Sequence, residues 1–394
     1  MGISRIGNEE KLLLRLCVSA PIEDDEFNWD EIDYKRFIHV VGSHNMFGRL
    51  RYHTYDKHVS AGSRKFWMLM KAIVAAINKM DEKSSKKQDV FIARMLDIMD
   101  KNGFNGIVMK GPVLQSIIYT DMPYVRPFGD LDVLLPEEQA IAFHAHLLKN
   151  EGMRYGGRYS ENYDSWYKAG LEMSQHLIPL YDNDGTIEVH HRLNHSFMST
   201  KPNLSVVFEK AERISTRFGM MTVPDKYDML IMLCYHMYYH NCYENEMRVS
   251  LHVDIIDWLT YIQKTEPKNW VECLLSRTSE HKLFDAVSYC IVHTQQLLEC
   301  IGFENELDDM LLKEFATETT RYKAEEIHSR FMLSEQAFGH WNIPYIERLF
   351  MNKVQLEKEV AFAIYHELII EKWEPKLHSI GIYDLHPQED GHYW

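Results

Sequence analysis

The sequence predicts an α+β protein in which a small mixed sheet with its own helices, an α/β core, lies between two helical regions. Apolar residues recur every three or four positions from Glu9 to about Ser85, a spacing typical of helices. Short apolar runs bounded by glycine and turn residues then indicate strands, and helical spacing returns after about Lys201. The expected division is an N-terminal helical region over 1–88, the core over 89–200 and a C-terminal helical domain over 201–394.

The N-terminal region carries three apolar segments with helical spacing. They are LLLRLCVS, YKRFIHVVGSHNMFGRL and FWMLMKAIVAAINKM. A further helix is expected from about Val90 to Asn102, because Gly103 follows as a residue that readily ends a helix. These segments predict that helices precede the first strand.

The core begins with the apolar run from Gly106 to Met109, which is short enough for a buried strand. Proline is favoured near the first position of a helix, so Pro112 indicates a helix that extends to about Tyr119. A loop then leads to a strand over residues 130–135. The core therefore starts as strand, helix and strand.

The second half of the core is expected to begin with a helix at Pro136, where two acidic residues favour the positive end of the helix dipole. Two strands follow over about 173–181 and 186–191, joined by a turn over 182–185. A turn this short favours antiparallel pairing. We therefore expect antiparallel strands in the sheet, in contrast to the parallel sheet of doubly wound nucleotide folds.

The last part of the chain returns to amphipathic or buried helical patterns. Helices are expected over about 226–241, 249–263, 270–277, 282–300 and 353–373.

Composition and charge favour an ordinary globular protein, with 45% hydrophobic and 26% charged residues. The formal net charge of −15 disfavours binding along a long nucleic acid. The N-terminal apolar run is interrupted by Arg15 and is too short for an export signal, and no later run is long enough to span a membrane. We expect a cytoplasmic protein without a membrane segment, whose six cysteines are reduced.

Asp130 and Asp132 begin the predicted strand over 130–135 and are the first candidates for chemistry. Residues i and i+2 of a strand point to the same side, so the two carboxylates lie together while Leu131 and Val133 face the core. Adjacent carboxylates repel each other unless a cation lies between them, and hard divalent cations prefer such ligands. The spacing indicates metal-dependent phosphate chemistry, although Asp-x-Asp alone is common on protein surfaces.

The Lys110-Gly111 turn precedes a predicted helix, whose first N–H groups and positive dipole end favour an anion. Lys110 adds a charge that suits phosphate oxygens. The alternative is that Gly111 only permits a tight turn and Lys110 is solvated. Arg126, in the loop before Gly129, is placed either to neutralise a polyphosphate or to pair with one of the two aspartates.

Glu188 and His190 share one face of the next core strand, while Ile187 and Val189 share the other. Glu188 is thus placed to complete a three-carboxylate metal site or to help deprotonate an attacking hydroxyl. The alternative is the exposed face of an edge strand.

The combined pattern is Lys-Gly, a helix, an Arg, Gly-Asp-Leu-Asp-Val-Leu and a later Glu-Val-His. It resembles a bacterial nucleotidyltransferase family of mostly unassigned function, within the DNA-polymerase-beta-like nucleotidyltransferase superfamily. The resemblance covers most of the chain and is strongest between Lys110 and His190. Residues outside that stretch that fit the same layout are Trp29, His44, His236, Arg248 and Asp254.

The resemblance implies that Asp130, Asp132 and Glu188 are the catalytic residues and bind Mg²⁺, or Mn²⁺ in its place. Lys110-Gly111 stands where many superfamily members carry a Gly-Ser or Gly-Gly turn. The residues expected to bind the nucleotide are Lys110, Gly111, Arg126 and Gly129, and those expected on the acceptor side are His190, His236, Arg248 and Asp254. His236 and His240 also have the spacing of two zinc ligands on a helix, but the bulky apolar residues around them favour core packing.

The implied reaction is in-line attack of an acceptor hydroxyl, or another nucleophile, on the α-phosphate of a nucleoside triphosphate such as ATP. Pyrophosphate would leave, and two metal ions would stabilise the attacking and leaving oxygens. The expected acceptor is a small molecule, a peptide or a protein. Two alternatives are a transferase that uses a nucleotide sugar and a catalytically idle nucleotide-binding protein, which the intact carboxylates disfavour.

Overall fold

The computed structural model describes most of the chain between residues 7 and 324. The described residues are 7–17, 28–44, 46–50, 86–120, 122, 125–156, 167, 171, 174–194, 201–243, 248–266, 268–299, 301–302 and 307–324. The segment FWMLMKAIVAAINKM and the helix expected over 353–373 lie outside these residues.

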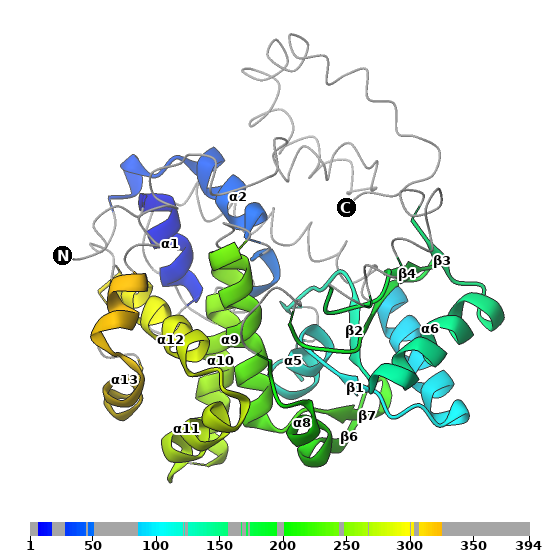
Figure 1. Ribbon diagram of the computed structural model, residues 1–394. Helices are drawn as coiled ribbons and strands as arrows, with labels where there is room; N and C mark the ends of the chain where they lie inside the picture. Colours follow the sequence, from blue (N-terminus) through cyan, green and yellow to red (C-terminus); the bar gives the residue numbers. More distant parts are fainter. Residues whose placement is uncertain are drawn as a thin grey trace.

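The core contains a five-stranded sheet in the order β1-β2-β5-β4-β3 (Figure 1). The strands are β1 (Ile107–Val108), β2 (Leu131–Leu134), β3 (Arg154–Tyr155), β4 (Leu180–Tyr181) and β5 (Thr186–His190). The mixed sheet of the prediction is confirmed, since β2 pairs in parallel with β5 and the other pairs are antiparallel.

The expectation of antiparallel pairing is wrong for β2 and β5, the two strands at the centre of the sheet. Helix α6 (Glu137–Asn150) lies between them in the chain, together with β3 and β4. A connection of this length that contains a helix lets two strands run in the same direction. The turn over 182–185 joins β4 to β5 as an antiparallel hairpin, and the N–H of Asp182 donates to the carbonyl oxygen of Gly185 at 3.0 Å.

Helices pack against the buried face of this sheet. Residues 86–102 are helical and α5 (Gly111–Ile117) follows β1. Val133 on β2 and Val189 on β5 are fully buried, in the same hydrophobic cluster as Phe91 and Phe143 from the two longer helices. Because every second strand residue enters this core, the alternate residues are left on the opposite face of the sheet.

The described residues of the N-terminal region are mainly helical, as predicted, and contact a helix of the C-terminal region. Its elements are α1 (Asn8–Cys17), the 3-10 helix η1 (Trp29–Glu31) and α2 (Tyr34–Ser43). The ring Nδ1 of His44 accepts a hydrogen bond from the N–H of Val249 at 3.1 Å. Arg49 donates to the carbonyl oxygen of Ser250 at 2.8 Å. Both contacts hold this region to the start of α10 (Val249–Thr265).

Over its described residues, which end at 324, the C-terminal region is mainly helical, and the helices predicted over 226–241, 249–263, 270–277 and 282–300 are present. They are α9 (Lys226–Tyr243), α10, α11 (Trp270–His281) and α12 (Phe284–Glu299), with α8 (Leu204–Lys210) before and α13 (Asp309–Phe315) after them. The sequence prediction missed the hairpin of β6 (Glu212–Thr216) and β7 (Gly219–Val223). Gly219 has φ +114°, a conformation that favours glycine at this turn.

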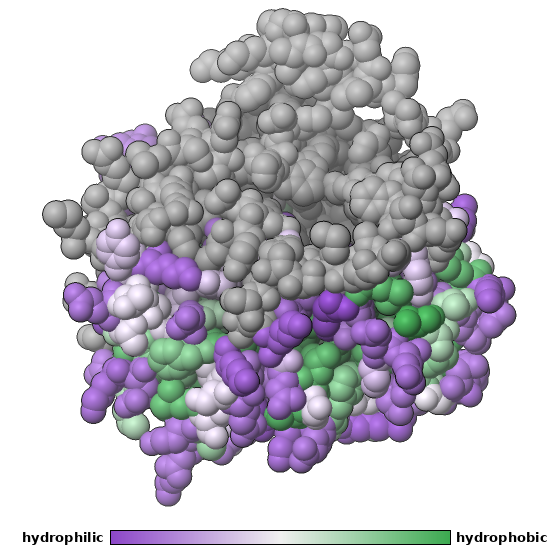
Figure 2. All heavy atoms as spheres, in the orientation of Figure 1, coloured by the Kyte–Doolittle hydropathy of each residue, from purple (hydrophilic) through white to green (hydrophobic). Residues whose placement is uncertain are grey.

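One buried hydrophobic cluster runs from the core into the C-terminal helices, and includes Phe91, Val133, Met237, Trp258 and Tyr289. The division at residue 200 stays a prediction. On the face shown in Figure 2, hydrophilic residues predominate over the described part of the chain, with smaller hydrophobic patches among them. Among the described helices, none has the length and apolar character needed to cross a membrane.

Candidate active site

Strands β2 and β5 place two carboxylates side by side, because Asp132 and Glu188 are partners in the parallel register. Their neighbours Val133 and Val189 are also partners and are fully buried on the opposite face. Asp132 is itself 3% exposed and Glu188 is half-buried. Two acidic groups held this close and this far from water require positive partners.

His190 lies next to both carboxylates and completes a group of three ligand atoms. Its Nε2 is 2.8 Å from Oδ1 of Asp132 and 3.6 Å from Oε2 of Glu188. The ligand atoms of Asp132, Glu188 and His190 all lie within 4.8 Å of one another. Two carboxylates and an imidazole form a donor set that a divalent ion accepts, so the residues present fit a metal ion.

Asp130, the first predicted metal ligand, lies just before β2 and is not one of these three residues. The charges of these neighbouring groups still shift its pKa. Burial, together with repulsion from Asp132 and Glu188, raises the pKa of Asp130 to about 7. A carboxyl group that holds its proton for this reason would release it if a cation entered the cluster.

Lys110 supplies the cation nearest to the carboxylates. Its Nζ lies 2.9 Å from Oδ1 of Asp132, so it is not simply solvated. Burial opposes the charged form of Lys110, but attraction to Asp132, Asp130 and Glu188 outweighs it and raises the lysine pKa. Burial likewise opposes ionisation of Asp132, yet Lys110 and His190 hold the pKa of that carboxyl below its usual range. The φ of Lys110 is +55°, a strained value for a residue with a side chain.

His176 is a residue of this cluster that the sequence prediction missed. Its Nε2 lies 3.7 Å from Oε2 of Glu188, and its Nδ1 donates to the carbonyl oxygen of Leu177 at 2.7 Å. The segment around it forms an antiparallel bridge with His190. Burial lowers the pKa of His176, so the neutral ring presents the lone pair of Nε2 to the cluster. The sequence did contain a signal for His176. The residue lies within the strand predicted over 173–181, which the turn over 182–185 places opposite the strand of Glu188.

Arg126 pairs with Asp254 rather than with the aspartates of the cluster. Its Nη2 lies 2.9 Å from Oδ2 of Asp254, and its Nε lies 3.1 Å from Oδ1. The loop that carries Arg126 is thereby fastened to α10. Asp254 is fully buried, so its carboxylate contacts Arg126 and is closed off from solvent.

A second arginine shares this buried carboxylate. Arg49, from the N-terminal region, pairs with Asp254 and donates from Nε to the hydroxyl of Tyr119 at 3.1 Å. Tyr119 in turn donates to Asp257. Burial raises the pKa of Asp257 to about 6, while Arg126 and Arg49 outweigh burial and lower the pKa of Asp254. The network joins three segments that are far apart in the sequence.

Positive charge also gathers near His236 on α9, another predicted acceptor-side residue. Burial lowers the pKa of His236 well below its usual value, and the charges of Lys110, His240, Arg248 and Arg126 lower it further. The rings of His236 and His240 meet edge to face, with 4.4 Å between their centroids. His236 is therefore a neutral imidazole, and it lines the same pocket as Lys110 and His190.

The two predicted glycines of the nucleotide site differ in what surrounds them. A Cβ on Gly111 would lie 2.6 Å from Cβ and Cγ of Phe128. Gly111 is thus required for packing at the start of α5, which the interpretation as a phosphate turn did not foresee. A Cβ on Gly129 would meet nothing within 4 Å, so that position faces open space.

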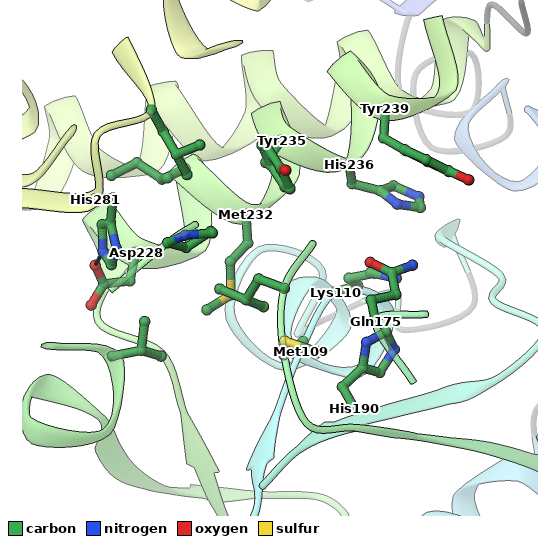
Figure 3. A pocket seen from close by; sticks show the side chains of 15 residues that line it. Met109, Lys110, Gln175, His190, Asp228, Met232, Tyr235, His236, Tyr239 and His281 are labelled. Carbon is green, nitrogen blue, oxygen red and sulfur yellow. Dashed lines mark hydrogen bonds and ion pairs between the residues drawn. The ribbon is translucent and has the colours of Figure 1, made fainter. Parts of the chain in front are cut away.

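A small pocket, part of it open to solvent, adjoins the cluster. Lys110 and His190 lie at one end with His236, as Figure 3 shows, and Asp228 and His281 lie at the other. It lies between the core and helix α9. Residues of the pocket that the sequence prediction missed are Gln175, Asp228 and His281.

The family described as uncharacterised nucleotidyltransferase matches residues 30–299 of this chain, more than half of its length. The match includes the carboxylate cluster, Lys110 and the whole of the pocket lining. No curated protein and no solved structure matches the chain.

Proposed function

The chain belongs to this family of uncharacterised nucleotidyltransferases, and we propose that it moves a nucleoside monophosphate from a nucleoside triphosphate to an acceptor nucleophile. Pyrophosphate is the leaving group. The α+β fold with its five-stranded mixed sheet is consistent with a nucleotidyltransferase. The observation that carries the proposal is the parallel pairing of Asp132 with Glu188, which places two carboxylates and His190 around one point.

We propose Mg²⁺, or Mn²⁺ in its place, as the cofactor. Asp132, Glu188 and His190 would hold the ion, with Asp130 as the further carboxylate beside them. A bound ion would supply positive charge for the phosphate oxygens during the transfer. The support for this assignment is the donor set, since carboxylate oxygens are the ligands that both ions prefer.

The triphosphate would bind across the cations that surround the cluster. Lys110, Arg126 and Arg248 all lower the pKa of His236, so the charge of each acts at that position. A triphosphate carries several negative charges and needs such partners. Gly129 faces open space in the loop before Asp130 and lets the backbone approach the nucleotide, whereas Gly111 would contribute through the shape of the turn.

The acceptor would enter from the side of α9. His190 and His236 line the pocket beside the cluster, and Arg248 lies near His236. Asp254 would act on this side only through Arg126, because it is fully buried and paired with that arginine. A small molecule, a peptide or a protein side chain fits this arrangement better than a long nucleic acid, which the net charge of −15 disfavours.

The test is transfer from each radiolabelled nucleoside triphosphate in the presence of Mg²⁺ and a mixture of candidate acceptors, with pyrophosphate measured in parallel. Asp130→Asn and Asp132→Asn should abolish transfer. Asp97→Asn is the matched control, because Asp97 is exposed and pairs with Lys101 on the surface. Transfer that requires a nucleotide sugar instead of a triphosphate would replace the proposed donor, and full activity of both variants would remove the metal assignment.

A further inference from the structure

His176 lies beside the carboxylate cluster on a segment that pairs with β5. The N–H of Leu177 donates to the carbonyl oxygen of Val189 at 3.0 Å, and Leu177 is fully buried. Because neighbouring residues of a paired strand segment point to opposite faces, the core position of Leu177 leaves His176 on the same face as Glu188. The rings of His176 and His190 meet edge to face, with 5.3 Å between their centroids.

The hydrogen bond of the His176 ring turns its other nitrogen toward the cluster. A carbonyl oxygen only accepts, so Nδ1 carries the proton that it donates to Leu177 at 2.7 Å. Nε2 then lies 3.7 Å from Oε2 of Glu188. Histidines that bind a metal through one ring nitrogen almost always donate the N–H of the other to a carbonyl or carboxylate oxygen. His176 thus has the tautomer and the orientation of a metal ligand.

Glu188 joins His176 to the three ligand atoms already described. Its Oε2 lies 3.6 Å from Nε2 of His190 and 3.7 Å from Nε2 of His176. Ligand atoms of one ion, at bond lengths of about 2.0–2.2 Å, lie about 3–4 Å apart. The carboxylate oxygen of Glu188 is therefore placed to share an ion with each of the two nitrogens.

The edge of the cluster at His176 is also the accessible one. The side chains of His176 and Glu188 are 22% and 21% exposed. Those of His190 and Asp132 are 1% and 4% exposed. An ion that enters from solvent therefore meets His176 and Glu188 first.

A second imidazole changes the kind of ion that the cluster prefers. Mg²⁺ takes oxygen ligands and gives up its water reluctantly, whereas imidazole nitrogen suits first-row transition ions. With His176, the donor set contains two nitrogens and two carboxylates. Such a set discriminates against Mg²⁺.

We propose that His176 is a further ligand of the divalent ion at the carboxylate cluster, and that its nitrogen makes the site select Mn²⁺ over Mg²⁺. The proposal rests on the proposed function, since it names the ion that the transfer site uses. It adds to that function a residue and a selectivity that carboxylates alone would not provide.

The test measures the affinity of the full chain for Mn²⁺, and for Mg²⁺ by competition, and counts the nitrogens bound to Mn²⁺ by pulsed electron paramagnetic resonance. The wild type should bind Mn²⁺ at least about tenfold more tightly than Mg²⁺, with couplings to two imidazole nitrogens. A single coupled nitrogen, equal affinities for the two ions, or no binding of Mn²⁺ would each overturn the proposal. These three results need no variant.

His176→Gln replaces the ring nitrogen by an amide group that offers an oxygen. The affinity for Mn²⁺ should fall by about tenfold or more, and one of the two nitrogen couplings should disappear. The affinity for Mg²⁺ should change by less than about twofold, because an amide oxygen suits that ion. A structural role of His176 would instead lower both affinities by the same factor, and that result would overturn the proposal.

His146→Gln is the matched control. His146 lies on α6, and its Nε2 is 3.3 Å from Oε1 of Glu151, with 19% of the histidine side chain exposed. It thus forms a histidine–glutamate pair of similar distance and exposure outside the cluster. This variant should keep both affinities and both nitrogen couplings. A loss of Mn²⁺ affinity as large as that of His176→Gln would overturn the proposal.

Transfer of a label from the α-phosphate, measured on the same samples with either ion, separates this proposal from the proposed function. If the wild type transfers the label but shows one coupled nitrogen, only the role of His176 is wrong. If it binds Mn²⁺ through two nitrogens but transfers no label to any candidate acceptor, the proposed function is wrong and the ion site stands.

Discussion

Asp132 and Glu188 are register partners on the parallel strands β2 and β5, and Nε2 of His190 lies within 3.6 Å of both side chains. This relationship turns two acidic residues that are distant in the sequence into one candidate metal site. It also explains why the carboxylates need Lys110 and His190 as partners in the metal-free protein. The first four predictions below follow from this cluster.

Asp132→Asn should lower the affinity for Mn²⁺ by at least about 10–100-fold. Substitution of a residue that only hydrogen-bonds to a metal ligand already lowers metal affinity by about that factor. The amide keeps the shape of the side chain but loses the charge of the central ligand. Mn²⁺ binding can be followed by electron paramagnetic resonance of the free ion. Asp97→Asn should bind Mn²⁺ as the wild type does, and equal affinity in the Asp132 variant would contradict the assignment.

The affinity for Mn²⁺ should rise with pH, by about tenfold per pH unit while Asp130 still carries its proton. The pKa of Asp130 is raised from 3.8 to about 7, so a cation must displace that proton below neutral pH. Dissociation constants at pH 6, 7 and 8 check this. Asp130→Asn should have a flatter profile, and an unchanged profile in that variant would assign the proton to another group.

The stability of the metal-free protein should fall as pH rises, whereas the affinity for Mn²⁺ should rise. A folded-state pKa above the unfolded one gives a stabilisation that is complete below the unfolded pKa and is lost as pH rises through the folded pKa. For Asp130 this window runs from about pH 4 to about pH 7. Hydrogen bonds to Asp132 and Glu188 outweigh burial and also raise the pKa of His190, which extends the loss above pH 6.5. Chemical denaturation in a chelator should show the decline, and excess Mn²⁺ should reverse it near pH 8.

Lys110→Met should strengthen binding of Mn²⁺ alone and weaken binding of a triphosphate, each by about tenfold, because one close positive charge is removed. The lysine now lies 2.9 Å from Asp132, where it competes with a metal ion but attracts phosphate. Calorimetric titration with each ligand measures both effects. Lys101→Met, at an exposed position, should change neither. A parallel fall in both affinities would indicate that Lys110 is mainly structural.

Gly111→Ala and Gly129→Ala should separate packing from nucleotide binding. Gly111→Ala should destabilise the fold by about 1–3 kcal/mol, because the new methyl group would overlap Phe128. Gly129→Ala should change stability by less than about 0.5 kcal/mol, since nothing lies within 4 Å. If the backbone at Gly129 approaches the triphosphate, this second variant loses triphosphate affinity in spite of its intact fold. Unchanged affinity would remove Gly129 from the nucleotide site.

Asp254→Ala should lower the free energy of unfolding by about 3–5 kcal/mol, because it leaves Arg49 and Arg126 without their buried counter-ion. Denaturation by urea measures the loss. Asp100→Ala, which removes the partner of Arg213 on the surface, should cost less than about 1 kcal/mol. Similar small losses in both variants would show that water or another side chain satisfies the two arginines.

Much of the core could be predicted from the sequence because its signals are local. The period of two in the strands of Asp132 and Glu188 places apolar residues on one face and acidic ones on the other. The helices after residue 225 follow the same kind of rule with a longer period, and α9 to α12 lie where the apolar spacing predicted them. The hairpin of β6 and β7 also had a local signal, an alternating run with Gly219 at its turn, and was overlooked.

The remaining features depend on tertiary structure, which local patterns do not specify. Arg126 and Asp254 are separated by 128 positions, so nothing near Arg126 shows that its partner lies on α10. The parallel pairing of β2 with β5 depends on the path of the chain through α6, β3 and β4. His281 approaches Asp228 only because α11 packs against α9. The sequence motifs therefore predicted the carboxylates, while their partners and the pocket required the fold.

The most direct test of nucleotidyl transfer compares triphosphates labelled in the α-phosphate with triphosphates labelled in the γ-phosphate. The full chain is incubated with Mg²⁺, each labelled triphosphate and a mixture of small-molecule and peptide acceptors, and the label in the product is counted. We expect that the α-label enters the product, that the γ-label leaves as pyrophosphate in equal amount, and that Asp132→Asn abolishes both. Transfer of the γ-label to the product, or undiminished transfer by Asp132→Asn, would contradict this expectation.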